Sequence, residues 1–170
     1  ENNAFIALTR HFASLSLPVP KIYAVSHDGL AYLQSDLGNT TLYDALKEGR
    51  ESTSGYQPAD ISLLEKTIRL LPRMQVLGGK SLDYSVCYPQ ESMDEQNILF
   101  DLNYFKYCFL KTTNVDFNEM KLEQCFKSMA KDLSNEPTNY FMYRDFQARN
   151  VMLTEEGEPQ FIDYQGGRRG

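Results

Sequence analysis

Three polar side chains near the C-terminal end of the 170-residue chain have the types and spacing for phosphoryl transfer. Asp145 is followed five positions later by Asn150, and a second aspartate, Asp163, ends a short apolar run. The first aspartate can accept or orient the proton of an attacking hydroxyl. The asparagine and the second aspartate supply the hard oxygen ligands that Mg²⁺ prefers. This set predicts a magnesium-dependent phosphotransferase with Asp145 as its catalytic base.

Short strands must position these side chains. Residues 150–154 and 160–164 have strand-like patterns, and Glu156-Gly157 lies between them as a turn. Because the two strands of a hairpin are antiparallel, Asn150 and Asp163 should lie at the same end of the pair. Residues 139–142 are expected to form a further short strand.

The rest of the chain has the periodicity of helices and one more hairpin. Apolar residues at steps of three and four predict helices over 2–16, 59–77, 94–111 and 116–133, with a shorter one starting at Thr40 or Thr41. The last long helix should begin at a capping box of Asp116 and Glu119. Two apolar faces should be buried, one of Ile61, Leu64, Ile68 and Leu71, the other of Leu99, Leu102, Phe105 and Phe109.

The second hairpin and the order of the elements set the fold class. Residues 21–26 and 30–34 read as strands on either side of Asp28-Gly29, a dipeptide typical of hairpin turns. A helix and hairpin, a mostly helical middle and three short C-terminal strands predict an α+β fold.

Composition excludes several classes of function. The chain has 17 Lys and Arg against 23 Asp and Glu, a formal charge of −6, which argues against a nucleic-acid partner. No apolar run approaches the roughly 20 residues that span a bilayer, so no membrane partner is expected. The three cysteines, Cys87, Cys108 and Cys125, show no metal-ligand spacing. We therefore expect a soluble protein of the reducing cytoplasm.

Three segments resemble one family of enzymes. They are the Leu33-Gln34-Ser35-Asp36-Leu37-Gly38 stretch, the Arg144-Asp145-Phe146-Gln147-Ala148-Arg149-Asn150 loop, and Phe161-Ile162-Asp163-Tyr164-Gln165-Gly166-Gly167-Arg168. Together they are similar to the aminoglycoside-phosphotransferase-like small-molecule kinases, and most of all to bacterial kinases that phosphorylate N-acetylmuramate or N-acetylglucosamine at the anomeric hydroxyl. The resemblance implies a protein-kinase-like fold that is incomplete here. Residues 1–38 would be part of the N-lobe, with helix, hairpin and hinge, and residues 39–170 part of the C-lobe, with a helical insert and the catalytic loop.

The resemblance also assigns roles to single residues. It implies ATP and Mg²⁺ as cofactors, Asp145 as catalytic base, and Asn150 and Asp163 as metal ligands. Ser35 and Leu37 would contact adenine through their backbone, and Glu1 would pair with the phosphate-binding lysine. Gln147, Arg149 and Arg168 would contact the acceptor, a small-molecule sugar, in particular an amino sugar used in cell-wall recycling. Oligomeric state is left open.

Departures from the family pattern keep two alternatives open. The glycine-rich loop and strand lysine of the family are absent, so we expect this chain to be a segment of a longer parent that carries the activity. Ala148-Arg149-Asn150 also echoes the catalytic loops of protein kinases, although Tyr164-Gln165 replaces their Phe-Gly after the metal aspartate. The second alternative is a catalytically degenerate kinase fold that serves as a nucleotide-binding or scaffold module.

Overall fold

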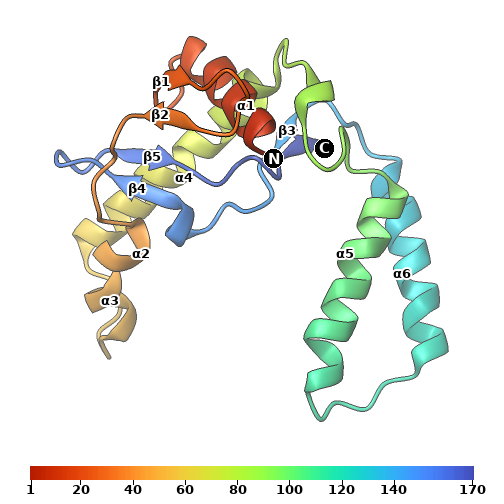
Figure 1. Cartoon of the computed structure of the whole chain (residues 1–170). Coiled ribbons are helices and arrows are strands. Elements are labelled where there is room, and N and C mark those ends of the chain that lie inside the picture. Colours follow the sequence, from red (N-terminus) through yellow and green to blue (C-terminus); the bar gives the residue numbers. More distant parts are fainter. The chain divides into compact units, whose positions relative to one another are not determined.

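The computed structural model describes residues 1–170, and it confirms the α+β class (Figure 1). Helices are combined with three antiparallel sheets of two strands each. The chain forms two compact units, one of residues 1–91 and 140–169 and the other of residues 92–139. The division into lobes at residue 38 is a different partition of the chain and stays a prediction. None of the helices combines the length and the apolar character that crossing a bilayer requires.

The first unit contains most of the elements. Its N-terminal part comprises α1 (Asn2–Ser14), β1 (Ile22–Val25), β2 (Tyr32–Gln34), α2 (Leu42–Ala45), α3 (Lys47–Glu51), α4 (Pro58–Gly79) and the 3₁₀ turn η1 (Tyr84–Val86). Its C-terminal part comprises β3 (Phe141–Met142), the 3₁₀ turn η3 (Ala148–Asn150), β4 (Val151–Leu153), β5 (Pro159–Phe161) and β6 (Arg168–Arg169). The sheets pair β1 with β2, β3 with β6 and β4 with β5.

The predicted turn of the first hairpin is confirmed. Gly29 has a φ of 70°, the left-handed region that glycine adopts without a steric penalty. The carboxylate of Asp28 accepts hydrogen bonds from the Ser26 hydroxyl at 2.7 Å and the Leu30 backbone N–H at 3.0 Å. These bonds lower the pKa of Asp28, the Ser26 bond most of all. Thr41 likewise caps α2, because its hydroxyl accepts the Asp44 N–H.

An aromatic core joins α1 to the C-terminal strands. The Phe12 ring lies 4.9 Å from the ring of Phe141 and 5.3 Å from that of Tyr164, both edge-on. Thr9, one turn before Phe12, bonds the Tyr164 hydroxyl at 2.6 Å. All four side chains are almost completely buried. Helix α1 is thereby packed on the residue that follows Asp163.

The buried face of α4 matches the predicted one in part. Leu64 and Leu71 are half-buried against the core, but Ile61 and Ile68 are exposed, and Thr67 and Met74 are buried. The helix is rotated because its end approaches β3 closely, and a Cβ added at Gly79 would lie 2.8 Å from the backbone nitrogen of Phe141. The Thr67 hydroxyl is accommodated in this position by donating to the Leu63 carbonyl at 2.9 Å.

The second unit is a helical hairpin. It consists of α5 (Glu95–Cys108), the 3₁₀ turn η2 (Leu110–Thr112) and α6 (Glu119–Ser134), with the two helices packed on each other (Figure 1). The predicted burial of Phe105 and Phe109 is wrong, since both rings are exposed and stack on each other 5.5 Å apart. The predicted capping residue is also wrong. Asn118 rather than Asp116 caps α6, because its side-chain oxygen accepts the Lys121 N–H at 2.9 Å.

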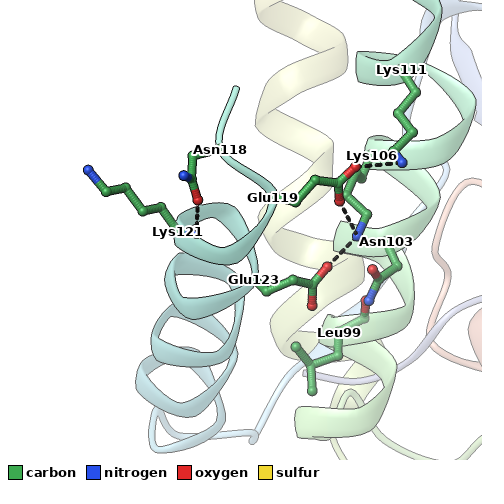
Figure 2. A network of polar contacts seen from close by, with 8 residues as sticks. All are labelled: Leu99, Asn103, Lys106, Lys111, Asn118, Glu119, Lys121 and Glu123. Atoms are coloured by element: carbon green, nitrogen blue, oxygen red, sulfur yellow. Dashed lines mark hydrogen bonds and ion pairs between the residues drawn. The ribbon is translucent and has the colours of Figure 1, made fainter. Parts of the chain in front are cut away.

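A lysine, rather than the two predicted phenylalanines, is buried in this hairpin. The Lys106 side chain is 3% exposed, and its ammonium group pairs with Glu123 and, at 3.7 Å, with Glu119 (Figure 2). Lys111 pairs with Glu119 at 2.6 Å. The hydrogen bond to Glu123 is the main cause of the raised pKa of Lys106. The lysine therefore stays charged between the two helices.

Candidate functional site

The C-terminal hairpin places Asn150 and Asp163 together, as predicted. Strands β4 and β5 pair with Val151 opposite Phe161, and the Ile162 N–H donates to the Asn150 carbonyl at 3.1 Å. Gly157 takes the left-handed conformation at the turn, with a φ of 76°. This register places Asn150, the residue before β4, and Asp163, the residue after Ile162, at the same end of the two strands.

The Asn150 side-chain amide connects the three predicted catalytic residues. Its nitrogen donates to the Asp163 carboxylate at 2.8 Å and to the backbone carbonyl of Asp145 at 2.9 Å. Asn150 is buried, and these two bonds satisfy both of its amide hydrogens. The Gln165 amide donates to the other carboxylate oxygen of Asp163 at 2.7 Å. The loop that holds Asp145 and the Asp163 carboxylate are thus both bonded to the Asn150 side chain.

The backbone is strained at Asp163 itself and at Arg144, the residue before Asp145. Arg144 has a φ of 69° and Asp163 a φ of 62°, the left-handed region that costs a residue with a Cβ about 1–2 kcal/mol. Such strain persists only where surrounding contacts hold it, and it concentrates at functional sites. The Tyr143 hydroxyl provides one of these contacts by donating to the Ile162 carbonyl at 2.5 Å. Burial raises the pKa of Tyr143, so its phenol remains a neutral donor.

A cleft of about 470 Å³ opens at this end of the hairpin. Its lining combines polar side chains with the apolar surfaces of two rings and an isoleucine, and consists of Glu1, Asn2, Phe5, Tyr32, Gln34, Asn150, Ile162, Asp163 and Gln165. The structure therefore brings Glu1 to the same cleft as the two predicted metal ligands. The Phe5 and Tyr32 rings, 5.2 Å apart and tilted by 32°, supply its aromatic surface.

The predicted hinge residues have different surroundings. The Ser35 N–H donates to the Lys21 carbonyl at 2.8 Å, and its hydroxyl accepts the Lys21 N–H at 2.9 Å, so this residue extends the β1–β2 pair. Leu37 lines a second cleft of about 630 Å³ between residues 36–40 and 153–156. The structure thus places Glu1 and Leu37 in separate clefts, with Ser35 directly after β2, between the cleft-lining residues Gln34 and Asp36.

The three predicted acceptor contacts are also spread out. Gln147 is exposed, and its carbonyl accepts the Asn150 N–H at 2.9 Å. Arg149 is exposed, with its guanidinium carbon 3.7 Å from the centroid of the Tyr43 ring. Arg168 is 4% exposed on β6, opposite Met142, and bonds the Gly166 carbonyl at 3.4 Å.

The oxygen atoms of Asn150 and Asp163 are of the chemical type that Mg²⁺ binds. Because the Asn150 nitrogen is held by Asp145 and Asp163, the amide oxygen is the atom left to act as a ligand. The Asp163 carboxylate adds a charged hard donor beside it. Mg²⁺ is commonly bound by one or two such protein ligands, with water and substrate phosphates completing its shell.

Two residues of the site were not expected from the sequence. Gln165, two positions after Asp163, orients the carboxylate, and its proximity in the chain is the only signal that could have indicated it. Tyr43 stacks on Arg149 from an element far away in the sequence, and nothing local marks that contact.

Comparisons with known proteins add no family to this description. Neither a scan against models of known protein families nor a search of curated proteins finds a match for the chain. The interpretation of the site therefore depends on its geometry and on the residues that form it.

Proposed function

We propose that this chain is part of an ATP- and Mg²⁺-dependent phosphotransferase with a kinase-like fold, and that it phosphorylates a hydroxyl of an amino sugar used in cell-wall recycling in the cytoplasm. The observation that carries the proposal is the Asn150 amide, which bonds both Asp163 and the backbone of Asp145 beside a cleft. An isolated Asp-Asn pair in a loop bonds its own backbone. Here Asn150 also bonds the side chain of a second aspartate, Asp163, thirteen residues further along the chain.

Each of the three residues has a distinct role in this proposal. The Asp145 carboxylate is exposed, so it is accessible to the acceptor hydroxyl and can take or orient its proton. Asn150 and Asp163 would hold Mg²⁺ through the amide oxygen and the carboxylate. Bound there, Mg²⁺ would neutralise charge on the nucleotide phosphates. The hydrogen bonds of Asn150 and the strained backbone of Asp163 keep these oxygen atoms in place before any ligand arrives.

The cleft that Asn150 and Asp163 line supports the proposed binding of a nucleotide next to these two residues. Asn150 and Asp163 line it together with the Phe5, Tyr32 and Ile162 side chains, a combination of polar and apolar surface suited to the phosphate end of a nucleotide. Glu1 lines the cleft too, in keeping with its proposed pairing with a lysine of the parent protein. The Leu37 N–H, the proposed adenine contact, takes no part in the hydrogen bonds that hold this segment, which use Ser35, Lys21, Asp36 and Gly38.

The acceptor is tested on the full-length protein. It is incubated with ATP and Mg²⁺ and a panel of amino sugars, aminoglycosides, choline and peptides, and transfer of phosphate is followed. Turnover of amino sugars supports the proposal. Turnover of peptides alone would assign a protein kinase, and nucleotide binding without any transfer would assign the degenerate module.

A substitution of the proposed base tests the mechanism. Asp145→Asn keeps the size of the side chain but cannot accept the proton, so kcat should fall by about 10²–10⁴-fold. Nucleotide affinity, measured by calorimetry, should stay nearly the same, because the metal ligands are untouched. The matched control is Asp132→Asn, an exposed aspartate of α6 in the other unit. An unchanged kcat for the Asp145 variant would remove this residue from the mechanism.

A further inference from the structure

Two arginines enclose a tyrosine directly beside the catalytic loop. The guanidinium carbons of Arg50 and Arg149 each lie 3.7 Å from the centroid of the Tyr43 ring. Two guanidinium planes cannot share one face of a ring at that distance, so the ring lies between them. We refer to Arg50, Tyr43 and Arg149 as the guanidinium stack.

The two arginines differ in how they are held. Arg50 donates to the Tyr43 carbonyl of α2 at 2.7 Å and has Glu51 of its own helix 3.9 Å away, so its charge has partners within the protein. Arg149 is exposed, and no carboxylate lies within 4.0 Å of its guanidinium nitrogens, although the chain as a whole is acidic. Its guanidinium lies over the Tyr43 ring, a contact that restricts the guanidinium, while the exposure of the side chain keeps its N–H groups accessible.

The position of Arg149 in the chain determines which part of a bound acceptor its guanidinium N–H groups can contact. It immediately precedes Asn150 and lies four positions after Asp145, so it belongs to the loop between the proposed metal ligand and the proposed base. An acceptor whose hydroxyl is at Asp145 brings its other substituents near this loop. A negatively charged substituent would be repelled by Asp145 and Asp163, so it requires a cation held beside them.

We propose that the guanidinium stack selects acceptors that carry an anionic group, with Arg149 binding the anion and Tyr43 acting as its positioning residue. This inference rests on the proposed function and adds the charge of the acceptor to it. A carboxylate and a phosphate present the same chemistry to a guanidinium, namely two oxygen atoms that accept parallel N–H bonds. Tyr43 matters because a fixed guanidinium plane loses less freedom when it forms this pair.

The test compares three acceptors with the full-length protein. They are N-acetylglucosamine, which is neutral, N-acetylmuramate, which bears a carboxylate, and N-acetylglucosamine 6-phosphate. Wild-type protein should prefer one or both anionic sugars by kcat/KM, and which one it prefers identifies the anion. Arg149→Gln should lower kcat/KM for that sugar by about 10- to 100-fold, and for the neutral sugar by less than about threefold.

Further variants separate positioning from charge. Tyr43→Leu should reduce the preference for the anionic sugar by about 2- to 5-fold, and Tyr43→Phe, which keeps the ring face, should restore it. Arg149→Lys keeps the charge without the planar fork and should fall between wild type and Arg149→Gln. Lys47→Gln is the matched control, because it removes one exposed positive charge from α3 without touching the stack. An equal loss for Lys47→Gln and Arg149→Gln would overturn the proposal.

Other outcomes are equally decisive. Equal losses on neutral and anionic sugars in Arg149→Gln would give Arg149 a purely structural role and overturn the inference. A rise in KM for ATP alone would assign the arginine to the nucleotide and overturn it too. If wild-type protein phosphorylates no sugar, the proposed function fails. Calorimetric titration of the two anionic sugars into wild type and Arg149→Gln then still tests anion binding, and equal affinities would reject it.

Discussion

The hydroxyl of Tyr164 shows how a single residue connects the site to the core. Thr9 donates its own hydroxyl hydrogen to the Phe5 carbonyl at 2.6 Å, so in the 2.6 Å contact between Thr9 and Tyr164 the tyrosine is the donor. Both side chains are fully buried. A buried hydroxyl left without its partner loses about 1–3 kcal/mol, whereas removal of both partners costs much less.

A double-mutant cycle tests this bond. Thr9→Val leaves the Tyr164 hydroxyl without an acceptor and should lower the free energy of unfolding by about 1–3 kcal/mol. Tyr164→Phe alone should cost about 1 kcal/mol, and the double variant should be less destabilised than the sum of the two. Urea unfolding provides the free energies. Strict additivity would mean that the two hydroxyls do not interact.

At the scale of elements, the position of α4 depends on its last residues. A Cβ at Gly79 would lie 2.8 Å from the Phe141 nitrogen and 2.9 Å from the Tyr84 hydroxyl, contacts that real Cβ atoms do not make. A Cβ at Gly78 would be 3.1 Å from the Phe12 ring, a milder contact. A side chain at Gly79 would therefore meet the backbone of β3, whereas a side chain at Gly78 would meet only an aromatic ring and a leucine side chain.

This difference gives a matched pair of variants. Gly79→Ala should destabilise the protein by about 1–3 kcal/mol, because the backbone of β3 must move. Gly78→Ala should cost clearly less, since the gain in helix propensity of roughly 1 kcal/mol offsets a milder contact. Thermal unfolding of both variants distinguishes them. A Gly79 variant as stable as wild type would show that β3 can move away from α4 at little cost.

Elements defined by local signals were predictable from the sequence, and those defined by distant partners were not. The β4–β5 hairpin was predicted because its turn and its alternation lie within a few residues, and with it came the meeting of Asn150 and Asp163. The rotation of α4 depends on Phe141, and β6 exists only because Arg169 pairs with that same residue. The contact of Tyr43 with Arg149 likewise joins distant segments.

At the scale of the whole molecule, the chain is divided into two compact units, and we predict that the second can unfold without the first. The second unit has a charged residue, Lys106, buried between its helices and paired with Glu119 and Glu123. Removing a partner from a buried charge is costly, and reversing the charge is worse, because three carboxylates would then face one another.

Hydrogen exchange can test this separation. Lys106→Glu should abolish protection of the amides of α5 and α6, while the amides of α1 and α4 keep theirs. Lys121→Glu is the control, since it makes the same charge change at an exposed position near the start of α6 (Figure 2). Loss of protection throughout the chain would instead mean that the two units unfold as one.

Stability of the whole molecule should also depend on alkaline pH. Burial raises the pKa of the Cys87 thiol from its ordinary value of 9.0 to about 11. The neutral thiol is thus favoured in the folded state, so its contribution is complete below pH 9 and is lost as pH rises from 9 to 11. Burial raises the pKa of Tyr143 and Tyr164 as well, which extends the loss above pH 10.

Urea unfolding between pH 7 and pH 11 measures this effect. Wild type should lose on the order of 1–2 kcal/mol through Cys87 over that range, and Cys87→Ala should show a shallower decline. Cys108→Ala, at an exposed cysteine, should follow the wild-type curve. Identical slopes for wild type and Cys87→Ala would exclude the thiol as a source of the pH dependence.

The two hydrogen bonds of the Asn150 amide have a consequence for ligand affinity. Because both are formed in the protein alone, Asn150 and Asp163 have already lost their rotational freedom when folding is complete. The entropy of ordering them is therefore lost on folding, and the proposed binding of Mg²⁺ and a nucleotide would not have to supply it again. The two side chains are preorganised for that proposed role.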